Sequence, residues 1–180
     1  MYSVSRDKAG EEGMEFGLSF GTNLEDRIQH LRIARKAVLA VEGTRECAAS
    51  PLYETDPVDV LPEYRGMKFV NAVIIIESEY SAEEWLELIN LIETAMGRVR
   101  SGDKNAPRTI DIDILYAGDQ CIDSGGLTVP HPRWTSRRFV LQPLSDVRGD
   151  MLLPQQAETV SQLLAALESD ENTVKLEETW

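Results

Sequence analysis

The spacing of apolar residues along this chain changes several times, and each spacing predicts a different element. Residues 14–20 alternate loosely between apolar and polar positions, which is typical of a strand. Apolar residues at helical spacing follow over residues 24–41. We expect Asn23 to cap this helix and Gly43 to end it, since these residue types favour the two ends of a helix.

The middle of the chain predicts two more strands and a second helix. A strand is expected at residues 45–53, interrupted near Pro51, and another at residues 68–77. The polar loop between them contains two further prolines. Ser81 and Glu84 have the spacing of a capping box, and a regular apolar stripe follows them, so a helix is predicted there.

The strictest alternation occurs at residues 110–116. It places three isoleucines on one face of a strand and Asp111 and Asp113 on the other. A short hairpin is expected next, and Thr159 with Gln162 can cap a last helix. The element order predicts an α+β fold with a ferredoxin-like βαββαβ core, in which helices pack on an antiparallel sheet, plus a C-terminal hairpin and helix.

The length and the apolar content set the domain organisation. With 180 residues, of which 42% are hydrophobic, the chain is expected to form a single domain at residues 14–168, with tails at 1–13 and 169–180. The longest apolar run, residues 69–76, is too short to cross a bilayer, and the first residues lack the apolar centre of a secretory signal. We therefore expect a cytoplasmic protein that does not associate with membranes.

The two cysteines match no recognised motif. Cys47 and Cys121 are far apart in the sequence and fit neither a redox pair nor a zinc site. We expect both to be buried, reduced thiols.

Positive charge is concentrated in one segment of an acidic chain. The formal net charge of −13 argues against a protein whose surface binds nucleic acid. Residues 98–138 nevertheless contain seven basic residues against five aspartates, a net charge of +2, so the rest of the chain has −15. This distribution favours a local anion-binding site over a merely solvated basic face. The basic residues are Arg98, Arg100, Lys104, Arg108, Arg133, Arg137 and Arg138.

Asp111 and Asp113 are the strongest candidates for chemistry. Two residues apart on a strand, they point the same way and repel each other unless a cation lies between them. A pair of acids alone would indicate a solvated face, but Arg98 and Arg108 lie close by in the sequence. Acids with arginines favour Mg²⁺ and a polyphosphate bound together. No P-loop, dinucleotide-binding loop or kinase catalytic loop is present, and no Ser or Cys nucleophile is indicated.

The residues also form an ordered set of motifs that resembles the hydroxymethyldihydropterin pyrophosphokinases. The resemblance extends from about Gly17 to Pro154 and is most specific in PRTIDIDIL, residues 107–115, and TVPHPR, residues 128–133. It implies transfer of pyrophosphate from ATP to the hydroxymethyl group of 6-hydroxymethyl-7,8-dihydropterin, giving AMP and the pterin diphosphate in folate biosynthesis. It also implies a Mg²⁺-dependent enzyme, which we expect to be a monomer.

The resemblance assigns roles to particular residues. Asp111 and Asp113 would hold two Mg²⁺ ions, and Arg98 and Arg108 would join them as catalytic residues. The implied ATP site consists of Glu93, Arg98, Arg100, Arg108, Ile114, Thr128, His131 and Arg137. The implied pterin site consists of Thr55, Asp56, Phe69, Asn71 and Phe139. Without the resemblance, the two phenylalanines would be read as ordinary core residues.

Some positions depart from the family pattern. Asn105 stands where many bacterial members have a tryptophan, Lys104 where an arginine is common, Asp56 where proline is frequent and Asn90 where glutamine is common. The loops at residues 56–66 and 101–106 resemble segments that close over the substrates in the family.

Two other readings of the sequence stay open. A ferredoxin-like RNA-binding module would be expected to have an exposed aromatic motif that is missing here. A degenerate paralogue would be expected to lack one of the four catalytic candidates, and all four are present.

Overall fold

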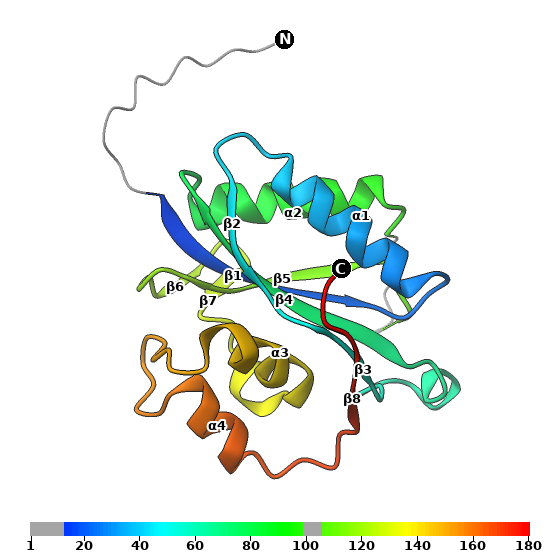
Figure 1. Ribbon diagram of the computed structural model, residues 1–180. Helices are drawn as coiled ribbons and strands as arrows, with labels where there is room; N and C mark the ends of the chain where they lie inside the picture. The colour runs from blue at the N-terminus through cyan, green and yellow to red at the C-terminus, as the bar shows by residue number, and fades with distance from the viewer. Residues whose placement is uncertain (1–12, 99–105) are drawn as a thin grey trace.

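A computed structural model describes residues 13–98 and 106–180 as a sheet with helices on both of its faces (Figure 1). Within these residues no helix is long and apolar enough to span a bilayer. The strands are β1 (Met14–Thr22), β2 (Arg45–Ala49), β3 (Leu52–Thr55), β4 (Phe69–Ser78), β5 (Asp111–Ala117), β6 (Ile122–Ser124), β7 (Leu127–Val129) and β8 (Thr173–Glu177). The helices are α1 (Arg27–Leu39), α2 (Ala82–Ala95), α3 (Arg138–Arg148) and α4 (Val160–Ala166), with short 3-10 turns at Pro62–Tyr64 and Trp134–Ser136.

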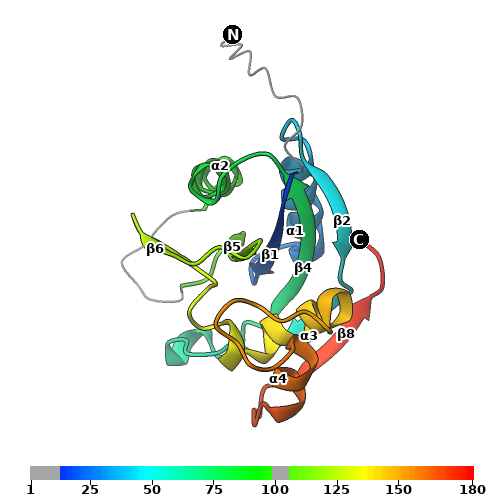
Figure 2. The same cartoon turned by 90° about the vertical axis from the view of Figure 1, so that its left-hand side faces the viewer.

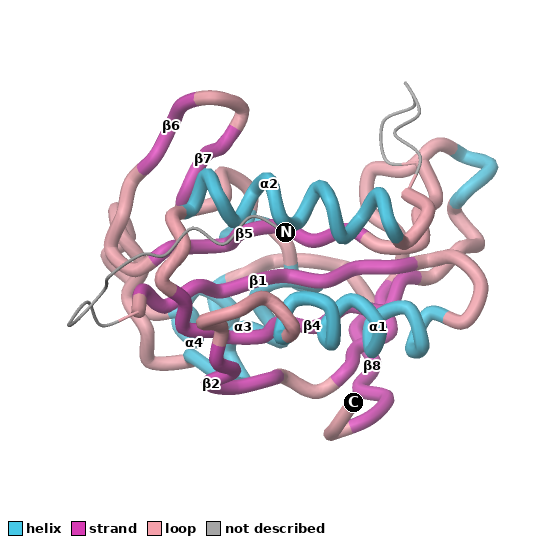
Figure 3. The backbone as a smooth tube through the Cα atoms, turned by 90° about the horizontal axis from the view of Figure 1, so that it is seen from above, coloured by secondary structure: helices cyan, strands magenta, loops and turns pink. Residues whose placement is uncertain are grey.

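The main sheet is antiparallel throughout and has the order β5-β1-β4-β3-β8. β2 and β3 pair with the same edge of β4, β3 with residues 69–71 and β2 with residues 74–77. The predicted interruption of this strand near Pro51 is therefore confirmed. β6 and β7 form a separate hairpin, which projects from the body of the molecule in Figure 3. These pairings confirm the ferredoxin-like α+β fold and the predicted hairpin and helix.

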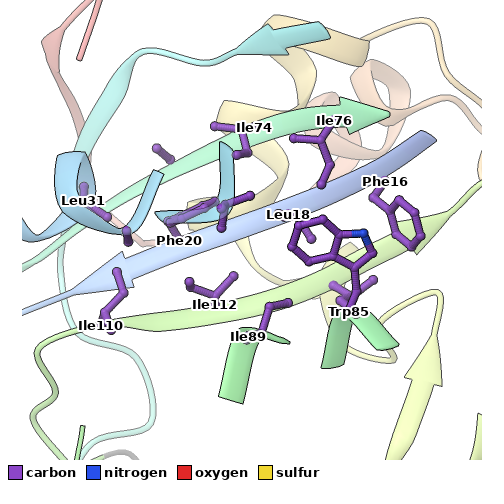
Figure 4. Close-up of a cluster of buried hydrophobic side chains, with 14 of the residues drawn as sticks. Phe16, Leu18, Phe20, Leu31, Ile74, Ile76, Trp85, Ile89, Ile110 and Ile112 are labelled. Carbon is purple, nitrogen blue, oxygen red and sulfur yellow. The ribbon is translucent and has the colours of Figure 1, made fainter. Parts of the chain in front are cut away.

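One face of the sheet is apolar from end to end. Alternate residues of β1, namely Phe16, Leu18 and Phe20, are fully buried beneath α1 and α2 (Figure 4). Trp85 of α2 inserts into this layer with its ring centroid 6.2 Å from that of Phe16. Period-two alternation in the strands and an apolar helix stripe thus meet in one core, as the sequence pattern predicts.

The opposite face is divided into two halves. Figure 2 shows the sheet nearly edge-on, with α3 and α4 on the side away from α2. Under α3 the sheet presents apolar side chains, including Val73, Ile75 and Tyr116. Beyond α3, the same face of β1 has only the small residues Ser19 and Gly21, and a polar cleft lies over this half.

A β-bulge in β5 lies at the boundary between these halves. Ile114 pairs with Leu18 but Tyr116 pairs with Gly17, so Leu115 is an extra residue on β5. Both Leu115 and Tyr116 consequently pack on the α3 side, where strict alternation would have separated them.

The predicted helix starts are partly confirmed. The capping boxes at Ser81 and Thr159 are both formed. The predicted cap at Asn23 is wrong, because Asp26 caps α1 by accepting a hydrogen bond from the Gln29 N–H. Asn23 instead accepts from the backbone N–H of Arg108, at 2.8 Å, and so ties the strand-helix loop to the segment before β5.

Three further features differ from expectation. Helix α3 was not predicted, since Pro143 lies inside it and proline disfavours a helix interior. The segment expected as a C-terminal tail contains β8, which pairs with β3. Both cysteines are free, as predicted, but Cys121 is exposed and Cys47 only half-buried, so the expectation that both are buried is wrong. Cys121 directly precedes the projecting hairpin, where no second layer covers it.

Candidate active site

A cavity of about 230 Å³ lies over the polar half of the second face. It is bounded by the ends of β1, β3, β4 and β5, the loop after β3, the end of α2 and the start of α3. The lining residues are Ser19, Gly21, Thr55, Asp56, Val58, Asp59, Phe69, Asn71, Arg98, Arg108, Asp111, Asp113, His131, Arg133, Arg137 and Phe139. Four arginines and four aspartates are among them, so the cavity is highly polar.

The floor of the cavity follows from strand register. Asp111 lies opposite Gly21 and Asp113 opposite Ser19, so both acids stand beside small residues of β1. Gly21 is also opposite Asn71 of β4. A Cβ atom at Gly21 would lie 2.9 Å from the Asn71 Oδ1, so glycine is required here for Asn71 to keep its position.

Arg98 and Arg108 converge on one carboxylate. Arg98 Nη1 is 2.5 Å from Asp111 Oδ1, and Arg108 Nη1 is 2.7 Å from Asp111 Oδ2. Glu93, which is buried, forms an ion pair with Arg98 and accepts a hydrogen bond from the Ile112 N–H at 2.8 Å. Burial lowers the pKa of Arg98, but Asp111 and Glu93 outweigh this and the net pKa is raised. The Arg98 guanidinium is therefore charged, and the ion pairs with Asp111 fix the direction of both guanidinium groups.

Asp113 is held differently from its neighbour. Burial, together with the negative charge of Asp111, raises the pKa of Asp113 to about 7, while Arg137 acts in the opposite direction. A second carboxylate so close to the first is stabilised by a cation. Within the described residues, no third His, Cys, Asp or Glu joins the two aspartates as a metal ligand. This donor set fits Mg²⁺, which commonly binds one or two carboxylates and completes its shell with water and substrate phosphates.

The other end of the cavity is aromatic with a polar edge. Phe69 and Phe139 both line it, and Asn71 donates a hydrogen bond from Nδ2 to Thr55 Oγ1 at 2.7 Å. Each ring is also near an arginine: the guanidinium carbon of Arg108 is 5.8 Å from the Phe69 ring centre, and that of Arg137 is 5.4 Å from Phe139. The aromatic end and the cationic end are therefore in direct contact.

His131 connects this cavity to a second hollow beside the β6-β7 hairpin, of about 580 Å³, which Thr128 also lines. Thr128 donates to Asp123 Oδ1 at 3.2 Å across the hairpin. Burial, and after it the charges of Arg137 and Arg133, lower the pKa of His131 to about 4. The imidazole is consequently neutral near pH 7, and its Nδ1 accepts from the Arg133 N–H at 3.2 Å.

Most of the predicted site residues come together, and the exceptions are specific. Glu93 supports the cavity from behind. Ile114 lies on the opposite face of β5, in the core under α1 and α2, so its side chain is outside the cavity. Arg100 lies outside the described residues, as do Lys104, Asn105 and all of the 101–106 loop except Ala106.

Four lining residues were not predicted, namely Ser19, Gly21, Val58 and Asp59, whereas Arg133 was expected only as part of the basic segment. The signal for Ser19 and Gly21 was present in the sequence. With Gly17 they form a row of small residues at alternate positions of β1, which marks the face where side chains from neighbouring strands need space. No comparable signal identifies Val58 and Asp59, because they belong to a loop whose path depends on its tertiary contacts.

Comparison with known proteins places this cleft in a family. The model of the 7,8-dihydro-6-hydroxymethylpterin-pyrophosphokinase family matches residues 17–149. The 2-amino-4-hydroxy-6-hydroxymethyldihydropteridine pyrophosphokinase of Pseudomonas aeruginosa is 36% identical over 83% of this chain and 89% of its own length. The enzyme of the same name from Haemophilus influenzae is 32% identical over 88% and 96%.

Longer relatives contain a similar region. The folic acid synthesis protein fol1 of Pneumocystis carinii is 37% identical over 76% of this chain, which spans only 18% of that protein. A crystal structure of Plasmodium falciparum HPPK-DHPS with pteroate has the same fold, with a TM-score of 0.68 at 16% identity, over 88% of this chain and 43% of that one.

Proposed function

The chain belongs to the 7,8-dihydro-6-hydroxymethylpterin-pyrophosphokinase family, and we propose that it transfers pyrophosphate from ATP to 6-hydroxymethyl-7,8-dihydropterin in folate biosynthesis. The observation that supports this activity most directly is the joining of two sites in one cavity. Acids and arginines suited to a metal-bound polyphosphate stand at one end, and two aromatic rings with a polar edge at the other.

The aromatic end is proposed to bind the pterin. The faces of Phe69 and Phe139 suit a flat heterocycle, and burying such a ring between apolar faces is favourable. Asn71 and Thr55 would recognise the edge of the ring, because an amide offers both a donor and an acceptor. Asp56 lies in the loop that borders this end, 3.7 Å from Lys68 Nζ, and is proposed to help to shape it.

The cationic end is proposed to bind the triphosphate. Arg98, Arg108 and Arg137 present planar donors that suit phosphate oxygens. Asp111 and Asp113 would hold two Mg²⁺ ions, which would neutralise charge on the phosphates. His131 is shared with the hollow at the hairpin, so the nucleoside would extend toward Thr128.

In the proposed reaction the hydroxymethyl oxygen of the pterin attacks the β-phosphorus of ATP in line, and its hydroxyl proton is released to water. The bond from the β-phosphorus to the oxygen that bridges it to the α-phosphate breaks, and AMP leaves with that oxygen. The residues contribute orientation and fixed positive charge and form no covalent intermediate. We further propose that the domain extends from residue 14 through β8, instead of ending at residue 168, and acts as a monomer.

The test is AMP formation from Mg-ATP with and without the pterin alcohol, for wild type, Asp113→Ala and Asp119→Ala. Asp119 is an exposed acid in the turn after β5 and serves as the control. We expect pterin-dependent AMP from wild type and the control. The Asp113 variant should be at least about a hundredfold slower, since metal-mediated charge stabilisation contributes several kcal/mol. If folded wild type releases no AMP but binds ATP, the chain is a degenerate nucleotide-binding relative.

A further inference from the structure

A segment that the family model does not reach lies against the aromatic end of the cavity. After α4 the chain runs beneath α3 and then joins the sheet as β8 beside β3 (Figure 1). The family match ends at residue 149, so this strap, defined as residues 167–177, lies beyond it.

The strap contacts both sides of the proposed pterin pocket. On one side, the Leu167 carbonyl accepts from Arg138 Nη2 at 3.3 Å, at the start of α3. On the other, the Asn172 carbonyl accepts from the Asp56 N–H at 3.3 Å, and Thr173 pairs with Thr55. The two walls of the pocket come from distant parts of the sequence, and the strap is bonded to both.

Glu171 makes the contact closest to an aromatic wall. Its Oε2 accepts a hydrogen bond from the backbone N–H of Phe139 at 3.2 Å. The first N–H groups of a helix have no partner within the helix, and the N-cap of α3, Arg137, makes no side-chain hydrogen bond to them. Glu171 therefore supplies this helix with its cap from a distant segment, and a carboxylate also suits the positive end of the helix dipole.

The bond is formed in a partly dehydrated setting. Burial raises the pKa of Glu171, while the N–H groups of Phe139 and Arg138 act in the opposite direction. A hydrogen bond to a carboxylate is strengthened in such surroundings. The backbone at Phe139, and with it the direction of the ring, is thus held by a group outside the cavity.

We propose that Glu171 is a positioning residue for the pterin site, which acts by fixing the start of α3 and the Phe139 ring against the strand that bears Thr55. This inference rests on the proposed function, because it takes Phe139 to be a wall of the pterin pocket. It assigns no contact with substrate to Glu171. Arg137, the N-cap of α3, belongs to the ATP end, but Glu171 bonds to the Phe139 N–H, so we expect the effect on the pterin end to be larger.

The experiment compares Glu171→Ala, Glu171→Gln and Glu171→Asp with Glu178→Ala as the control. Glu178 is an exposed acid near the end of β8 that pairs with Lys175 at 3.1 Å. Pterin binding is measured by calorimetry in the presence of a non-hydrolysable ATP analogue, and KM is measured for each substrate. Circular dichroism confirms folding.

We expect Glu171→Ala to weaken pterin binding about tenfold, the value expected for one lost hydrogen bond to a charged group, with the KM for ATP within about twofold of wild type. Glu171→Gln keeps an acceptor oxygen and should recover most of the affinity. Glu171→Asp keeps the charge but cannot reach Phe139, so it should behave like the alanine variant, and it replaces that variant if alanine prevents folding.

Equal pterin affinity in wild type and Glu171→Ala, or equal losses for ATP and pterin, would overturn the positioning role while leaving the proposed function intact. Loss of affinity in the Glu178→Ala control would also overturn it. If wild type itself forms no AMP with the pterin, the proposed function fails instead, and the inference fails with it.

Discussion

The two faces of the sheet use the same strands for opposite purposes. On the face beneath α1 and α2, alternate residues of β1 are large and fully buried, as Phe16 and Phe20 illustrate. On the other face, the positions between them are Gly17, Ser19 and Gly21. One strand thus has a continuous core on one side and the floor of a cleft on the other.

This difference separates stability from chemistry. The apolar face excludes water over its whole length, and each large side chain there contributes to the free energy of folding. The polar half of the opposite face keeps charged groups close together in a cavity, an arrangement that costs folding energy unless the groups are paired or bind a ligand. Substitutions on the two faces should therefore affect different measurements.

The largest expected effect is on the apolar face. Trp85→Ala removes the largest fully buried side chain of this layer, and we expect the free energy of unfolding to fall by about 3–5 kcal/mol. Turnover per folded molecule should stay within about twofold. Urea denaturation measures the first quantity and an assay well below the melting temperature the second. Leu91→Ala, on the exposed side of α2, is the control and should change stability by less than about 0.5 kcal/mol.

The reverse pattern is expected for Arg108→Ala. This change removes a cation from Asp111, and we expect kcat to fall by about a hundredfold to a thousandfold, the range for one lost donor to developing charge. ATP binding should weaken much less. Steady-state kinetics at varied ATP measures both, with exposed Arg45→Ala as the control. Unchanged turnover would contradict the role given to Arg108.

The pH dependence of stability tests the buried His131, and replacing this neutral side chain by glutamine leaves the charge of the cavity at neutral pH unchanged. The pKa of His131 is lowered to about 4 in the fold, below its ordinary value of 6.5, so the unfolded chain binds the extra proton first. The contribution of the neutral His131 to the free energy of unfolding is therefore fully present above pH 6.5 and is lost as the pH falls toward 4. We expect His131→Gln to remove about 1–2 kcal/mol of the difference in unfolding free energy between pH 7 and pH 5. Identical pH profiles for the variant and wild type would argue against a buried neutral imidazole.

The smallest expected effect concerns the space between β1 and β4. Gly21→Ala would place a methyl group 2.9 Å from Asn71 Oδ1, which must then move. We expect the KM for the pterin to rise about fivefold, and stability to fall by about 1 kcal/mol. Kinetics with varied pterin is the measurement. If the KM for ATP rises more than the KM for the pterin, Asn71 belongs to the ATP end of the cavity, which would contradict its proposed role at the pterin end.

Local patterns in the sequence predicted the apolar face well. Ser81 with Glu84, and the alternation through Asp111 and Asp113, report structure that neighbouring residues determine by themselves. The acid pair was found for the same reason. These features need no knowledge of distant contacts.

The rest depended on tertiary context. Pro143 obscured α3, although Val140, Leu141 and Leu144 bury a helical stripe there. The polar sequence of β8 gives little indication of a strand, because it gains its hydrogen bonds from the edge of β3. Asn23 was expected to cap a helix, and its side chain is used instead by the distant Arg108 backbone.

The bulge at Leu115 also determines how this protein can tolerate changes in length. Removing one residue anywhere between Asp111 and Ile114 would turn the preceding part of β5 over, moving an acid into the core under α2. Removing Leu115 would only restore regular pairing beyond Ile114 and would leave Asp111 opposite Gly21. Insertions and deletions in β5 are therefore expected to be tolerated at the bulge and not at the acid pair. The length of the strand can then vary while the spacing between Asp111 and Asp113 stays fixed.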